Sequence, residues 1–109
     1  MMKNIISFFL MLVTLSVQAG WQEGQITKIL VRQSDGLHYF FMSGTATNRP
    51  ACAAGHTYWI LKDENSIAGK SQLSMLLTAY ASGKTVSVSG TDACTRWGDG
   101  EDVNVIQLK

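Results

Sequence analysis

The 109-residue chain contains a single proline, two cysteines and no large excess of charge of either sign. Its scarce proline and ordinary apolar content argue against a disordered chain. Nine basic residues face eight acidic ones. This balance argues against nucleic-acid binding, which requires a basic surface, and against a polybasic membrane-surface protein. We find no repeat, low-complexity tract or linker, so we expect one small domain.

The only long apolar run lies at the N-terminus. Lys3 precedes it, residues 5–13 are apolar apart from one serine, and Val17-Gln18-Ala19 has the short side chains of a cleavage site. The run is too short for a span of about 20 residues. We therefore predict a signal peptide at 1–19, a single mature domain at 20–109 and no membrane span after cleavage. The protein is then exported, either periplasmic or secreted. A retained membrane anchor is the alternative.

Both cysteines, Cys52 and Cys94, lie in the predicted mature domain. In an exported chain an even number of cysteines indicates a disulfide, and here only one pairing is possible. The alternatives are a metal site, which needs more ligands at short spacing, and a catalytic thiol, which must stay reduced. We predict the Cys52–Cys94 bond.

Hydrophobic patterning predicts five strands, and Asp35-Gly36 is a strong hairpin signal between the first two. Val86 and Val88 are expected to point inward, with Ser87 outward. Long loops are expected at 45–55 and 90–101. The expected strands are residues 25–32, 37–43, 57–62, 85–89 and 102–108.

One helix is expected between the third and fourth strands. Ser71 is a candidate N-cap, and Gly83 is expected to end the helix in the left-handed conformation. The apolar residues at spacing i, i+3, i+4 and i+7 predict the face that packs on the sheet. They are Leu73, Leu76, Leu77 and Tyr80.

The order of three strands, a helix and two strands predicts a mainly β protein with one helix. In a domain of this size the order fits the OB-fold, a five-stranded Greek-key barrel with its helix between strands three and four. Closure of the barrel also removes exposed strand edges. The alternative is an open antiparallel sheet with the helix packed on it.

Scattered positions of the chain resemble the OB-fold binding (B) subunits of bacterial toxins, especially those of the subtilase-cytotoxin and pertussis-like typhoid-toxin type. They also resemble small uncharacterised exported proteins of the same layout. The resemblance implies glycan binding and a homo-oligomeric ring, a pentamer. The matching residues are ITKILV at 26–31, Gln33, Asp35, Tyr39-Phe40, Ala51-Cys52, Tyr58-Trp59, AYASGK at 79–84 and VSV at 86–88.

Three departures from that pattern bear on the sugar specificity. Gln22 stands near the position where the toxin subunits carry a sialic-acid-binding serine. Ala46 stands near the place of their basic residue, and Cys94 lies in the long loop instead of following the last strand. The resemblance therefore implies the fold, whereas the sugar specificity of the toxin subunits does not carry over with it.

No catalytic constellation is visible. His38 and His56 are the only histidines, and we expect the first to be structural and the second to lie at the surface. No nucleophile stands beside an oriented base, so we expect no enzyme. The acidic residues Asp99, Glu101 and Asp102 are expected to be solvated. They resemble a calcium loop in composition but do not match an EF-hand, so we expect no metal and no cofactor.

The candidate binding residues are Trp97, Arg96 and Asp99 in the 90–101 loop, with Trp21 and Gln22 at the first strand. An aromatic ring beside hydrogen-bonding groups suits a sugar or a protein partner. The alternative is that Trp97 only closes the barrel end. The sequence thus favours an exported, non-enzymatic binding module for a glycan or protein. The alternative function is a periplasmic structural or inhibitory protein-interaction domain without glycan binding.

Overall fold

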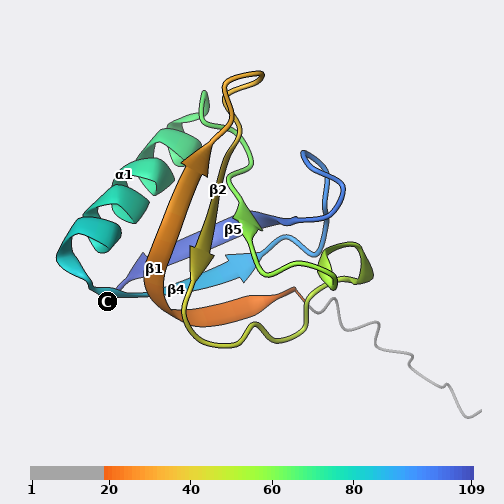
Figure 1. The fold of residues 1–109 in the computed structure, drawn as a ribbon, viewed down its shortest axis with the longest axis horizontal. Coiled ribbons are helices and arrows are strands. Elements are labelled where there is room, and N and C mark those ends of the chain that lie inside the picture. Colours follow the sequence, from red (N-terminus) through yellow and green to blue (C-terminus); the bar gives the residue numbers. More distant parts are fainter. Residues whose placement is uncertain (1–18) are drawn as a thin grey trace, which may run out of the picture.

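The computed structural model describes residues 19–109 (Figure 1). The predicted signal peptide lies outside the described residues except for its last position, Ala19, so it stays a prediction. Within residues 19–109, no helix is both long enough and apolar enough to cross a membrane.

The described residues form a closed five-stranded barrel, with strands in the order β1-β2-β3-β5-β4. Helix α1 lies between β3 and β4 in the chain and runs beside β1 in space (Figure 1). The barrel confirms the OB-fold prediction against the open sheet. The elements are β1 (Trp21–Val31), β2 (His38–Met42), a 3-10 turn η1 (Ala51–Ala53), β3 (Trp59–Ile60), α1 (Ile67–Ser82), β4 (Thr85–Gly90) and β5 (Glu101–Leu108).

Strand β1 closes the barrel because its two halves pair with different partners. Residues 21–25 pair with β4, and residues 26–31 pair with β2, with a register shift after Ile26. Where the strand bends, a Cβ on Gly24 would overlap the carbonyl oxygen of Ser43, so the close approach requires glycine. The strand starts four residues earlier than expected. The prediction began too late because Gln22 is polar although buried, so it interrupts the apolar alternation that indicates a strand.

Strand β3 is shorter than expected, with only Trp59 and Ile60 in the ladder. It pairs antiparallel with β2 and parallel with β5, which joins the two halves of the barrel. The main core lies inside, and Phe40, Trp59 and Val86 are among its fully buried residues. Val86 and Val88 lie in the core as predicted, whereas Ser87 between them is covered on the other side of the strand, where its hydroxyl donates to Oε1 of Gln107.

The helix starts earlier than predicted, at Ile67, and Ser66 is its N-cap instead of Ser71. The Ser66 hydroxyl accepts a hydrogen bond from the backbone N–H of Gly69 at 2.9 Å, as an N-cap should. The C-terminal prediction is confirmed, because Gly83 follows the helix with φ of 67°.

The predicted packing face of α1 is correct only in part. Leu76 is fully buried and Leu73 packs against the core, but Leu77 is 53% exposed and Tyr80 is 55% exposed. The small residue Ala79, fully buried, takes the place expected for Tyr80. The buried face of the helix thus combines the large Leu76 with the small Gly69 and Ala79, and a pattern of large apolar residues alone cannot reveal such a face.

The predicted disulfide is confirmed. Cys52 and Cys94 are bonded with their Cα atoms 6.2 Å apart, across 42 residues of sequence. The bond joins the segment after β2 to the β4–β5 loop (residues 91–100). A closed loop of this length corresponds to about 4 kcal/mol of stabilisation in the chain-entropy treatment.

Candidate binding face

Aromatic side chains gather outside the barrel on the β2–β3 pair. Along β2, Phe40 and Met42 enter the core, while Tyr39 and Phe41 alternate to the outer side. There they pack against a second apolar cluster with Leu37, Ile60 and Tyr58, and Trp97 from the β4–β5 loop joins them. We call the group Tyr39, Phe41, His56, Tyr58 and Trp97 the aromatic face.

The rings of the aromatic face form a continuous stack. His56 stacks on Tyr58 with centroids 4.9 Å apart, and Tyr58 stacks on Trp97 at 5.1 Å with ring planes 13° apart. Tyr39 meets both Tyr58 and Trp97 edge-on, at 5.6 and 5.2 Å. These are favourable aromatic geometries, so the rings hold one another in fixed orientations.

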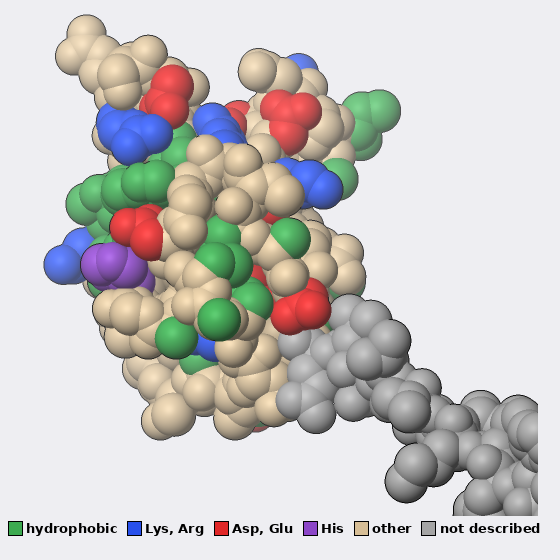
Figure 2. Space-filling model, turned by 90° about the vertical axis from the view of Figure 1, so that its right-hand side faces the viewer, with side chains coloured by type: hydrophobic (Ala, Val, Ile, Leu, Met, Phe, Trp, Pro, Cys, Tyr) green, Lys and Arg blue, Asp and Glu red, His purple; other side chains and the backbone are tan. Residues whose placement is uncertain are grey.

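Two cations lie over these rings. The Arg32 guanidinium lies 4.9 Å from the centroid of Trp97, and the Lys28 ammonium lies 4.8 Å from the centroid of Phe41. Arg32 also makes a two-point ion pair with Asp35 at 3.0 and 2.7 Å, which lowers the pKa of Asp35 to about 2. Figure 2 shows hydrophobic side chains interspersed with basic and acidic ones on the side of the molecule turned to the viewer.

The acidic residues at the start of β5 are not solvated as expected, because Glu101 and Asp102 are fully buried. Asp102 organises the turn before Trp97: its carboxylate accepts hydrogen bonds from the backbone N–H and hydroxyl of Thr95. Such hydrogen bonds explain why a loop carboxylate can be buried. Residues 19–109 contain no cluster of three or more His, Cys, Asp or Glu side chains suited to a metal ion.

Arg96 fixes the β4–β5 loop to the segment after β3. Its guanidinium donates to the carbonyl of Leu61 at 2.8 Å and forms an ion pair with Glu64. Glu64 also accepts from the backbone N–H of His38 at 2.7 Å. Burial opposes ionisation of Glu64, but these hydrogen bonds outweigh it and hold the pKa of its carboxyl below the usual range. Arg96 therefore positions its neighbour Trp97.

Asp99 lies at the His56 end of the stack, with its Oδ2 atom 3.3 Å from His56 Nε2. Burial and the neighbouring Asp99 carboxylate raise the pKa of Tyr58 above its ordinary value. The Tyr58 hydroxyl therefore stays protonated beside the Asp99 carboxylate at any physiological pH.

Of the five predicted binding residues, the structure brings Arg96, Trp97 and Asp99 together and places the other two apart from them. Trp21 begins β1, is 44% exposed, and pairs with Thr47 through its backbone. Gln22 is buried, and its amide donates to three carbonyls, among them that of Met42, while its Oε1 accepts from Trp59 Nε1. The side-chain amide of Gln22 thus links β1 to Met42 of β2 and to Trp59 of β3 inside the barrel.

Sequence reasoning missed most of the aromatic face. Tyr39 and Phe41 were expected only as strand residues, and Lys28 and Arg32 had no assigned role. A usable signal was present: in the run His38–Met42, aromatic residues at 39 and 41 alternate with the core residue Phe40. Both faces of that strand are aromatic, and this indicates that its outer side is also covered.

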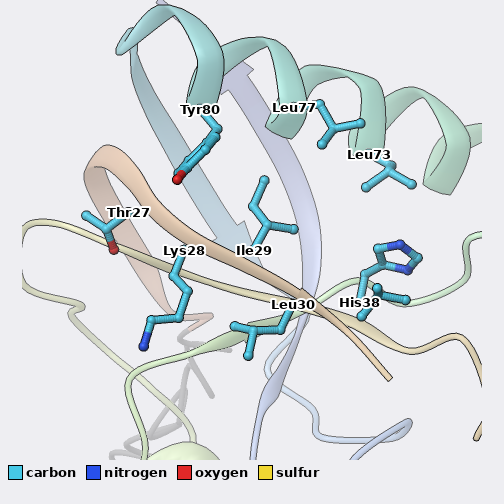
Figure 3. Close-up of a pocket in the computed structure, with 9 residues that line it drawn as sticks. Thr27, Lys28, Ile29, Leu30, His38, Leu73, Leu77 and Tyr80 are labelled. Atoms are coloured by element: carbon cyan, nitrogen blue, oxygen red, sulfur yellow. The ribbon is translucent and has the colours of Figure 1, made fainter. Parts of the chain in front are cut away.

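A separate apolar groove of about 440 Å³ lies between α1 and β1. Leu73, Leu77 and Tyr80 point from the helix toward the strand, and Ile29 points up toward them (Figure 3). Pairing of β1 with β4 stops at Gln25, so within the described residues the strand beyond this point is paired on one edge only.

Comparison with known proteins adds no relative to these observations: no family, no characterised protein and no solved structure matches the chain.

Proposed function

We propose that the protein is an exported, non-enzymatic binding module that recognises a glycan through the aromatic face. The observation that carries the proposal is the stack of Tyr58 and Trp97 with Arg32 and Lys28 set over the rings beside it. In OB-folds this side of strands two and three, flanked by the β1–β2 and β4–β5 loops, is a common ligand surface for oligosaccharides.

The chemistry of the face suits a sugar carrying an acidic group. The apolar C–H side of a pyranose ring packs on aromatic edges and faces, and the two cations attract a carboxylate or sulfate. The scaffold is rigid, because the closed barrel and the Cys52–Cys94 bond fix the loops that carry the site. A preformed face loses little conformational entropy on binding.

The test is a glycan array with the purified mature domain, followed by calorimetry with the best ligand. Lys28→Ala and Arg32→Ala are the informative variants, because both side chains lie at the surface and their loss leaves the barrel core intact. We expect each to weaken binding about tenfold, with Lys70→Ala on α1 as a matched control that binds normally. Equal affinity in all four proteins would exclude this face.

The apolar groove supports a second candidate function, that of a protein-interaction domain without glycan binding. An extended peptide with alternating apolar side chains could pair with the free edge of β1 beyond Gln25 and place those side chains against Leu77 and Tyr80. Peptides selected by phage display on the mature domain test this. They should bind Arg32→Ala normally and fail to bind Leu77→Lys; binding to both variants alike excludes the groove.

A further inference from the structure

The first residue of the predicted mature chain, Gly20, lies against a buried carboxylate. The backbone nitrogen of Gly20 is 3.1 Å from Oε2 of Glu101, whose side chain is fully buried. Oε2 also accepts from the backbone N–H of Asp92 at 3.0 Å. The other oxygen, Oε1, is buried with no hydrogen-bond partner among residues 19–109.

No basic side chain within residues 19–109 forms an ion pair with Glu101. Arg49 is near enough for its charge to be felt, but its N–H groups donate to the carbonyls of Thr57 and Tyr58, and its guanidinium lies over Trp59. A buried carboxylate with one oxygen unsatisfied and no paired cation is strongly unfavourable. A donor or positive charge near Oε1 would therefore stabilise the Glu101 carboxylate.

Two glycines shape the space around the carboxylate. A Cβ on Gly90 would overlap the carboxylate of Glu101, and a Cβ on Gly20 would overlap its Oε1 atom. The carbonyl of Gly20 accepts from the backbone N–H of Gly90 at 2.9 Å. Residue 20 is thus held on both sides, with its nitrogen directed at Glu101.

We propose that Glu101 binds the α-ammonium group that is created on Gly20 when the signal peptide is removed. Hydrolysis of the Ala19–Gly20 amide consumes one water, breaks the C–N bond, and leaves a carboxylate on Ala19 and an ammonium on Gly20. The amide offers Glu101 one N–H, whereas the ammonium offers three and a positive charge. Cleavage therefore places a positive charge and two further N–H donors beside the Glu101 carboxylate, which strengthens the contact of the Gly20 nitrogen with β5.

The proposal rests on export and cleavage, which belong to the proposed function, and is independent of the glycan. The other charged residues facing Glu101 are Arg49 and Asp92. Arginine stays protonated across the alkaline range, whereas an α-amine loses its proton within it. The difference in stability between chains that begin at Gly20 and at Ala19 therefore reports the Gly20 amine.

The sign of the pH dependence follows from the pairing. An α-amine in an unfolded chain has a pKa near about 7.8, and a buried carboxylate partner raises the folded value. The added stability is then fully present below about pH 8 and is lost as the pH rises through the raised folded pKa.

The experiment compares the domain beginning at Gly20 with the same domain retaining Ala19, each made by proteolytic removal of a tag. At pH 6.5 we expect the Gly20 form to melt at least about 5 °C higher, with the gap narrowing as the pH rises past the folded pKa. In Glu101→Gln the two forms should melt together. Equal melting of the two wild-type forms at pH 6.5 overturns the proposal.

A second measurement serves if Glu101→Gln does not fold. NMR titration of the Gly20 amine in the wild-type domain should give a pKa above about 8, and an ordinary or lower value overturns the proposal. The N-terminus of the exported protein, read by mass spectrometry, should be Gly20. A different N-terminus overturns both export processing and this pairing, whereas a failed glycan array overturns only the aromatic face as the ligand site.

Discussion

Two neighbouring leucines on α1 allow a sharp test of the packing described above. Leu76 is fully buried in the core, whereas Leu77 is 53% exposed beside the groove. The substitutions Leu76→Ala and Leu77→Ala remove the same three carbon atoms from adjacent helical positions. Helix propensity therefore changes equally in the two variants, and any difference in the free energy of unfolding reports burial alone.

The expected cost of Leu76→Ala is about 2–5 kcal/mol, from lost transfer energy and the cavity that remains. For Leu77→Ala we expect less than about 1.5 kcal/mol, because half of the side chain is already in water. At intermediate costs of about 3.5 and 1 kcal/mol, the difference in a domain of this size corresponds to a gap in melting temperature of about 10–20 °C.

Urea unfolding of the mature domain, followed by tryptophan fluorescence, measures both variants. Similar slopes against urea concentration are needed for the free energies to be comparable. If Leu77→Ala is as costly as Leu76→Ala, the helix packs through a different face and the groove is not open. If neither substitution costs more than about 0.5 kcal/mol, the helix does not contribute to the barrel core.

Three further predictions follow from the loops. Replacing Cys52 and Cys94 together with serine should lower the free energy of unfolding by up to about 4 kcal/mol, and an unchanged melting temperature would contradict the constraint. Asp102→Asn should cost about 1–3 kcal/mol and speed hydrogen exchange at the Thr95 amide; unaltered exchange argues against a positioning role. The lowered pKa of Glu64 predicts stability that is present above its unfolded pKa and lost as the pH falls through the folded value. The free energy of unfolding, measured with urea from about pH 5 to about pH 3, should depend less on pH in Glu64→Gln than in the wild-type protein. An equal pH dependence in the two proteins refutes the assignment.

Local signals predicted the parts of the fold that short-range chemistry determines. Asp35-Gly36 gave the hairpin, and Gly36 has a φ of 70°. Gly83 ended the helix, and the single possible cysteine pairing gave the disulfide. Each depends on a few adjacent atoms or on a unique combination, so tertiary context had little opportunity to override it.

The errors arose where long-range packing decides. The N-cap is Ser66 and not Ser71, although both serines satisfy the local rule; at Ser66 the following Gly69 also allows close approach to the Asp63 carbonyl. The burial of Glu101 and Asp102 depends on partners that the chain folds back to supply. The aromatic face was missed for the same reason, since its rings come from three separate segments.

The position of β5 has a consequence for the timing of folding. β5 is the last strand in chain order, yet it lies between β3 and β4 and forms both of the remaining seams of the barrel. A nascent chain that ends before Glu101 can form hairpins but cannot close. The β4–β5 loop, which carries Cys94 of the disulfide, also cannot be fixed in place before β5 is present. Closure therefore waits until synthesis has passed β5, and until then the barrel core cannot assemble.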